Sequence, residues 1–454
     1  MENCIKDAKE ARLDSETGPE DPTVYRELLD RLEACQEKLP PLYRDEIYIP
    51  YINKLKGMGQ NGFNKVLLKD PFKIGIASLM LDIAQAILQN GEGYLQRATD
   101  ACQEVLSDLY DGFLSEEDRV GIKRPDLSVI PPLAKWGCPN DGPYTWTAAS
   151  TRYFGFGKQA AIVNFPPGHA QRGLLAWAAL AHETSGHDIL EADKGLLSEL
   201  AYAVEQELQN GDVGNILPDY WAYRIDETAS DVLGILNMGP AAGIATIGYF
   251  RALNAAAGKD PALGNVGSLS SNAVHPVDIL RGYLAACVIG QLSFTGRDDW
   301  AKAIEIEVDK DLRNIMLGSP WSGYKEISPE YAKTSAEIVA ETLVHAKMEC
   351  LEYHSLGEIQ NWGDNDEWIV MQLRPILTKS SPLPNNYAEG IYAAHAVAAA
   401  VMAALAGDAD IPLIFDRMLG MLKTMHDANP SWGPMYVAHP GDLVFLRVHE
   451  TFED

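Results

Sequence analysis

Two histidines and a glutamate lie within six residues of the segment AHETSGHDIL (181–190). His182 and His187 carry imidazoles, which bind zinc, and Glu183 carries a carboxylate that can accept a proton from water. A regular helix turns by about 100° per residue, so two residues five apart lie about 140° apart on its surface. We therefore expect a π-type turn, which brings residues five apart onto one face, and Gly186 is the residue that most easily permits it.

A catalytic zinc ion usually takes three protein ligands and keeps one position open for water. The segment RIDETASDVLG (224–234) offers the third ligand on a second helical pattern. Glu227 and Asp231 are four residues apart, so both project from one face, whereas the rest of the pattern is apolar. Buried acids need a cation or hydrogen-bond donors. We expect Glu227 to bind the metal and Asp231 to orient a histidine ligand through its other ring nitrogen.

These two segments resemble the gluzincin family of zinc metallopeptidases. DETASDVLG resembles the glutamate helix of thermolysin-like peptidases, NExxSDxxG, and HETSGH resembles the HExxGH form of the dipeptidyl-peptidase III type, which has the same extra residue. The resemblance covers about residues 160–285 and implies a zincin-like fold with one zinc ion per chain. The residue roles that it implies are His182, His187 and Glu227 as metal ligands, Glu183 as general base and Asp231 beside the ligands.

A third segment, SLSSNAVHPVDILRG (268–282), extends the resemblance. His275 stands just ahead of an expected helix, as does the histidine that stabilises the oxyanion in thermolysin-like peptidases, although Pro276 to Asp278 depart from their pattern. We expect His275, or a tyrosine such as Tyr223, to hydrogen-bond the tetrahedral oxyanion. The resemblance also implies that residues 160–164 form an edge strand that pairs with the substrate backbone.

The residues together predict a zinc-dependent metallopeptidase acting on a peptide or small peptide-like substrate. An alternative is a vanadate-dependent haloperoxidase or acid phosphatase, because SGH (185–187), KRP (123–125) and HPVD (275–278) are similar to those signatures. Leu269, however, stands where that pattern has an arginine. A non-proteolytic zinc hydrolase or lyase uses the same metal ligands and is the other alternative.

The net charge of the chain bears on which classes of partner it can bind. The 64 acidic residues exceed the 37 Lys and Arg by enough to give a formal charge of -27. Such a surface repels phosphate backbones and anionic lipid, so we expect neither a nucleic-acid nor a membrane partner. The six cysteines form no CxxC pair and are expected to be reduced, and the charged N-terminus has no apolar signal core. These features favour a cytoplasmic protein.

The pattern of apolar residues predicts a mainly α (α+β) fold with a small mixed sheet, metal-binding helices and a helical C-terminal lobe. We expect a helical region at 1–125, a catalytic zincin-like lobe at 126–240 and the helical lobe at 241–454. Within them, residues 1–22 are expected to be a mobile arm and 116–147 a long connection. A strand at 158–168 and a helix at 172–190 should follow.

Three further expectations concern single features. The uncharged stretch 232–250 is expected to be a buried helix that breaks near Gly239 and Pro240 rather than a membrane span. Arg224 is expected to be the structural partner of an acid, and His395 a hydrogen-bonded core residue.

Overall fold

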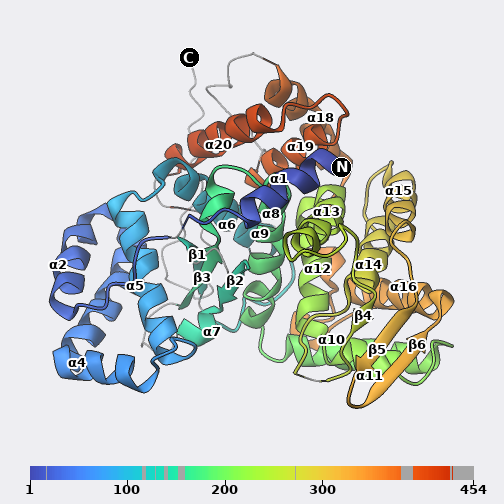
Figure 1. The fold of residues 1–454 in the computed structure, drawn as a ribbon, viewed down its shortest axis with the longest axis horizontal. Helices are drawn as coiled ribbons and strands as arrows, with labels where there is room; N and C mark the ends of the chain where they lie inside the picture. The colour runs from blue at the N-terminus through green and yellow to red at the C-terminus, as the bar shows by residue number, and fades with distance from the viewer. Residues whose placement is uncertain are drawn as a thin grey trace.

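The protein is mainly α-helical, which confirms the predicted mainly α (α+β) class, but its described residues form two small sheets where the sequence pattern predicted one. In the computed structural model, 65% of the chain is helix and 8% is strand. The structure describes residues 1–16, 18–114, 119–127, 129–137, 142–151, 159–270, 272–379, 392–429 and 432. Figure 1 shows one sheet between the N-terminal helices and the helices α12, α13 and α14.

Helices with buried apolar faces make up the N-terminal part. Leu28, Leu32 and Cys35 on one helix meet Ile83 and Ile87 on another within a local core. The long helical stretch at 74–114 divides at Gly93, whose φ of 76° ends the first of its two helices. The elements are α2 (Tyr25–Cys35), α3 (Pro41–Tyr43), the π turn η2 (Arg44–Tyr48), α4 (Ile49–Lys69), α5 (Ile76–Glu92) and α6 (Gln96–Leu114).

The expected mobile arm is wrong over half of its length, because residues 2–12 form helix α1 (Glu2–Arg12). Cys4, Ala8 and Ala11 follow one another at helical spacing and are buried against α8 and α13. The carboxylate of Asp7 accepts hydrogen bonds from the backbone N–H groups of Gly173 (2.9 Å) and Leu174 (3.1 Å). The buried face of this helix consists of small apolar residues. It was not recognised in the sequence because charged residues surround it.

The first sheet has strand order β1-β3-β2. The expected strand at 158–168 is present as β3 (Gln159–Phe165), which pairs in parallel with β1 (Val129–Trp136) and antiparallel with β2 (Tyr144–Trp146). The expected long connection at 116–147 is therefore wrong over these two strands. Two prolines hid β1, and they fall where its register with β3 shifts, between Ile130 and Leu133. The strand β3 is central, so the expected edge strand at 160–164 is wrong and β2 lies at that edge instead.

The expected single helix at 172–190 is a series of short turns. It comprises α8 (Leu174–Trp177), α9 (Ala179–Ala181), the π turn η5 (His182–Gly186) and the 3-10 turn η6 (Ile189–Ala192). The helices α10 (Leu196–Asn210), α11 (Leu217–Ala222) and α12 (Ile225–Met238) follow. Since α12 packs on η5, residues far apart in the sequence meet here.

The expected break near Gly239 and Pro240 is confirmed. Helix α12 ends at Met238, and α13 (Pro240–Ala256) begins after Gly239, whose φ is 63°. Gly239 also faces the ring of Trp362, which a Cβ atom would approach to 2.5 Å. Among the described residues, no helix is long and apolar enough to cross a membrane.

The rest of the chain is helical apart from a second sheet of order β4-β5-β6, which the sequence pattern did not predict. One large core joins residues of all three expected regions, among them Leu109, Trp177 and Met421. The proposed division into three regions stays a prediction. The elements are β4 (Val266–Gly267), α14 (Asp278–Gly290), α15 (Arg297–Asp309), β5 (Ile315–Ser319), β6 (Gly323–Ile327), α16 (Pro329–His345), α17 (Leu356–Ile359), α18 (Asp364–Thr378), α19 (Ala393–Ala404) and α20 (Ile411–Asp427).

Gly239→Ala tests the break between α12 and α13. The new Cβ combines a left-handed backbone with a clash against Trp362, so we expect a loss of about 2–4 kcal/mol in unfolding free energy. Gly258→Ala is the matched control, because Gly258 has a φ of 74° and open space around it. Chemical denaturation followed by circular dichroism measures both, and equal losses would contradict a special role for the Trp362 contact.

Candidate metal centre

The π turn η5 brings the two histidines of the opening motif together. It spans His182–Gly186, so the backbone widens over the surplus residue, as predicted. The ring centroids of His182 and His187 lie 4.9 Å apart with the ring planes at 88°. Both imidazoles therefore face one small volume despite their five-residue separation.

Gly186 is needed for space rather than for an unusual backbone angle. It is absent from the glycines with positive φ, but a Cβ atom there would lie 2.0 Å from the Cβ of Ser230 on α12. On the same face of α12, a Cβ at Gly234 would lie 3.3 Å from the backbone nitrogen of His182. The π turn and α12 thus pack closely, with only the small Ser230 side chain between them at Gly186. This close packing places the acidic residues of α12 beside the imidazoles.

Glu227 lies between the two imidazoles, as expected for a third ligand. Its Oε2 is 3.3 Å from Nε2 of His182, and its Oε1 is 3.7 Å from Nε2 of His187. One ligand atom from each of the three residues lies within 4.8 Å of the others. The group can hold a metal ion.

The Nδ1 atoms of both imidazoles are held by carboxylates of α12. Asp231 Oδ1 is 2.9 Å from Nδ1 of His182, as predicted, and Asp226 Oδ2 is 3.1 Å from Nδ1 of His187. Such carboxylates fix the orientation of a ligating imidazole and make it a better ligand. The role of Asp226 was missed, although its position next to Glu227 in the sequence was a usable signal.

A buried arginine on α14 completes this network. Arg281 donates hydrogen bonds from Nε to Asp231 Oδ2 (2.6 Å) and from Nη2 to Asp231 Oδ1 (2.7 Å). Burial disfavours the carboxylate of Asp231, but Arg281 and His182 outweigh it and lower its pKa to about 2. Asp231 is therefore ionised and fixed. Arg281 was also missed, because nothing in its local sequence distinguishes it from a surface arginine.

The arrangement of lone pairs fits a cation. When an imidazole donates its Nδ1 proton to a carboxylate, its Nε2 carries a lone pair, and here both Nε2 atoms face Glu227. Among the described residues Glu227 Oε2 has no hydrogen-bond partner, although Nε2 of His182 lies 3.3 Å away. Burial of these acceptors without a donor or a cation is costly.

Protons are the competing cations at this position. Burial lowers the pKa of His182, but its contacts with Asp231 and Glu227 outweigh burial and raise the pKa to about 10. Burial raises the pKa of Glu227, yet the neighbouring His182 and Arg281 bring it well below its usual range. Metal binding must displace such protons, so the carboxylates that raise the pKa also supply the charge that attracts a divalent ion.

Glu183 lies beside the metal-binding group. Its Oε2 accepts a hydrogen bond of 2.9 Å from Oγ1 of Thr145 on β2, and the residue is buried. Glu183, His182 and Asp231 line one cavity of about 420 Å³, together with Arg281. The expected general base thus shares a cavity with one candidate ligand, His182, whereas His187 and Glu227 are not among the residues that line it. Thr145 is a partner that the sequence analysis missed.

The structure separates the two candidates for the oxyanion. Nε2 of His275 lies 3.1 Å from Oε1 of Glu227, and His275 lines the cavity. Tyr223 is 66% exposed and is not among the residues that line the cavity. His275 is therefore at the candidate site and Tyr223 is beside it on the surface.

Arg224 holds the loop that carries His275. The expected acid partner is wrong: the buried guanidinium donates to the carbonyl oxygens of His275 (3.3 Å), Ser268 (2.7 Å) and Ser270 (3.0 Å). It also lies 4.0 Å from the ring centroid of Tyr220. Burial lowers the pKa of Arg224.

His395 is a core residue as expected, with Nε2 2.8 Å from Asp366 Oδ1.

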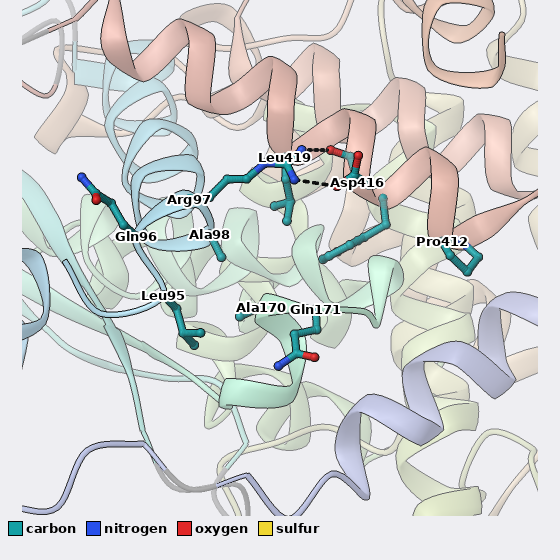
Figure 2. Close-up of a pocket in the computed structure, with 10 residues that line it drawn as sticks. Leu95, Gln96, Arg97, Ala98, Ala170, Gln171, Pro412, Asp416 and Leu419 are labelled. Carbon is teal, nitrogen blue, oxygen red and sulfur yellow. Dashed lines mark hydrogen bonds and ion pairs between the residues drawn. The ribbon is translucent and has the colours of Figure 1, made fainter. Parts of the chain in front are cut away.

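A second cavity of about 390 Å³ lies between α6, α20 and the turn at 167–170. Figure 2 shows Arg97 reaching toward Asp416 across its upper side, and Nη1 of Arg97 lies 2.5 Å from Oδ1 of Asp416. Its lining contains no histidine, cysteine or glutamate. This cavity offers neither a metal-ligand set nor an unpaired base.

Comparison with known proteins adds no identification: no family model, no curated protein and no solved structure matches this chain.

Metal binding is the direct test of the ligand group. We expect the chelator-treated protein to bind one zinc ion per chain in isothermal titration calorimetry, and Glu227→Ala to abolish that binding. Asp231→Asn should weaken it about 10–100-fold, because it loosens the orientation of His182. Asp219→Asn, at an exposed acid on α11, is the control. Unchanged zinc affinity in Glu227→Ala would contradict the site.

Proposed function

We propose that the protein is a zinc-dependent metallopeptidase of gluzincin type, with His182, His187 and Glu227 as ligands of one zinc ion. The observation that carries the proposal is the meeting of these three side chains at a π turn, with Glu183 lining one cavity together with His182. The motif resemblance agrees with this arrangement. A zincin-like fold for the catalytic part belongs to the same proposal.

Glu183 is the proposed general base. Zinc, when bound, would lower the pKa of a water molecule and polarise the scissile carbonyl. The Glu183 carboxylate accepts the proton of the attacking water and passes it to the leaving amine. The hydrogen bond from Thr145 fixes one carboxylate oxygen, which leaves the other to exchange protons. His275 is the proposed donor to the oxyanion, since it lies at the cavity and Tyr223 does not.

The proposed substrate is a peptide. Pro143 lines the cavity just before β2 begins at Tyr144, so a peptide in the cavity would pass near the edge of the first sheet. An edge strand offers free backbone groups for pairing with an extended chain. A proposed substrate therefore runs along β2 rather than along the central strand β3.

The alternatives differ in charge or in substrate. Vanadate and phosphate are anions, whereas Glu183, Asp226, Glu227 and Asp231 surround the candidate site with carboxylates. Lys123, which a vanadate site would need, pairs with Asp126 at 2.7 Å. No observation favours that alternative. A non-proteolytic zinc hydrolase uses the same groups, so only substrate tests separate it from a peptidase. The cytoplasmic location stays a prediction.

Glu183→Gln tests the mechanism. The amide cannot accept the proton, so we expect the variant to bind zinc with wild-type affinity and to hydrolyse peptides at least about 100-fold more slowly. A peptide-library digest read by mass spectrometry measures the loss, with Glu205→Gln on α10 as control. Full activity of Glu183→Gln would contradict the mechanism. Zinc binding without peptide cleavage by the wild type, but with ester hydrolysis, would favour the non-proteolytic alternative.

The two oxyanion candidates predict different kinetics. We expect His275→Gln to lower kcat by about tenfold to a thousandfold, because a donor to the developing charge acts mainly in the transition state. Tyr223→Phe should change kcat less than twofold, since that side chain is exposed beside the cavity. Steady-state kinetics on one cleaved peptide measures both, and the reverse ranking would show that Tyr223 moves into the site.

A further inference from the structure

The charge of the chain reverses over residues 47–81. This stretch contains five lysines and one acid, Asp70, in a chain whose acids number 64 against 37 basic residues. It forms α4, the following loop and the first part of α5. Figure 1 places α4 at one end of the molecule, far from β5 and β6. This segment is therefore basic within an acidic chain, although Asp21 and Glu33 from outside it pair with two of its lysines.

Large apolar side chains protrude from the same place. Leu68 is 80% exposed, Phe72 84% and Ile74 83%, and Ile76 is 45% exposed. Single exposed apolar residues are normal, but a contiguous group rimmed by polar residues marks an interaction site. We call residues 65–76 the lysine-apolar tip.

The tip is held in this shape by its one acid. The Asp70 carboxylate accepts hydrogen bonds from the backbone N–H groups of Ile74 (3.1 Å), Gly75 (2.8 Å) and Ala77 (3.1 Å). These bonds close the loop at the start of α5, so Phe72 and Ile74 point outward from a fixed turn. They also engage the only negative charge of the tip in bonds with its own backbone.

Unpaired lysines flank the apolar side chains. Lys73 pairs with Asp21 at 2.5 Å, and Lys56 pairs with Glu33 at 2.7 Å. Lys65 and Lys69 are exposed and have no ion-pair partner within the described part of the chain. They are four residues apart on α4, on the face that also carries Leu68. The two lysines and the apolar side chains are therefore exposed close together on the tip.

We propose that the lysine-apolar tip docks on the surface of an anionic lipid bilayer. Phe72, Ile74 and Leu68 would enter the boundary between headgroups and acyl chains, while Lys65 and Lys69 remain at the anionic headgroups. Protruding side chains on a convex turn suit a deformable interface, whereas a folded partner would need a matching pocket for each. This proposal revises the expectation that the protein has no membrane partner, which rested on net charge.

The acidic remainder of the chain does not prevent such docking. At physiological ionic strength the Debye length is about 8 Å, so charges on distant parts of the protein are largely screened at the tip. The local charge decides the attraction, and here it comes from Lys65 and Lys69, because Lys73 is paired with Asp21. Attachment at this one end would leave the candidate metal centre free, and the proposal does not depend on what that centre does.

Vesicle co-sedimentation tests the docking. We expect the full-length protein to bind vesicles of phosphatidylcholine with about 30% phosphatidylglycerol at least about tenfold more tightly than pure phosphatidylcholine vesicles. About 1 M sodium chloride, where the Debye length is about 3 Å, should reduce the binding. The variant F72S/I74S should lose at least about tenfold in affinity by removal of the inserting groups. K65E/K69E should lose the preference for anionic vesicles.

Two control variants change the same chemistry elsewhere. Trp321→Ser removes a side chain that is 96% exposed between β5 and β6, and K259E/K302E reverses two exposed lysines outside the tip. Both should bind vesicles as the wild type does, and circular dichroism should show all variants folded. The proposal is overturned if the wild type binds anionic vesicles no better than F72S/I74S. It is also overturned if the tip variants instead abolish a self-association seen by light scattering.

Discussion

The contact between the π turn and α12 leaves no room for a side chain at residue 186, and the candidate centre depends on that contact. At Gly186 only the small side chain of Ser230 lies between the two backbones, and at Gly234 the backbone of α12 lies directly against the backbone of His182. The acids of α12 can then reach the imidazoles directly. A wider separation would leave Glu227 too far from both histidines to share a cation with them.

Three acidic residues of α12 lie against the imidazoles beside this turn. Asp226, Glu227 and Asp231 sit on one helix, and each contacts an imidazole of the turn. Asp226 is exposed, but Glu227 and Asp231 are buried, and two buried carboxylates are costly unless cations neutralise them. Arg281 neutralises part of it through Asp231, and the remaining charge faces the two Nε2 atoms. The uncompensated negative charge and the candidate ligand atoms therefore lie in the same place, where a cation would satisfy both.

The sequence predicted which residues gather at the candidate centre better than it predicted the residues that support them. The five-residue spacing of the histidines required a π turn, and the break at Gly239 followed from glycine beside proline; both are present. Arg281 was missed because its contact with Asp231 runs between two helices and leaves no local pattern, whereas Asp226 was missed although it stands next to Glu227 in the sequence. Strand β2, which holds Thr145, was hidden by nearby proline and glycine, and Arg224 bonds to carbonyl oxygens, which composition does not reveal. Likewise, net charge concealed the positive tip, because a sum over the chain does not show where charges lie.

An anomalous-difference map from zinc-soaked crystals tests the central claim most directly. We expect one strong peak per chain, about 2.0–2.2 Å from Nε2 of His182, Nε2 of His187 and a carboxylate oxygen of Glu227. The π turn should keep its contact with α12 in that map. A strong peak elsewhere, or imidazoles of His182 and His187 turned away from each other with Glu227 out of reach, would contradict the account.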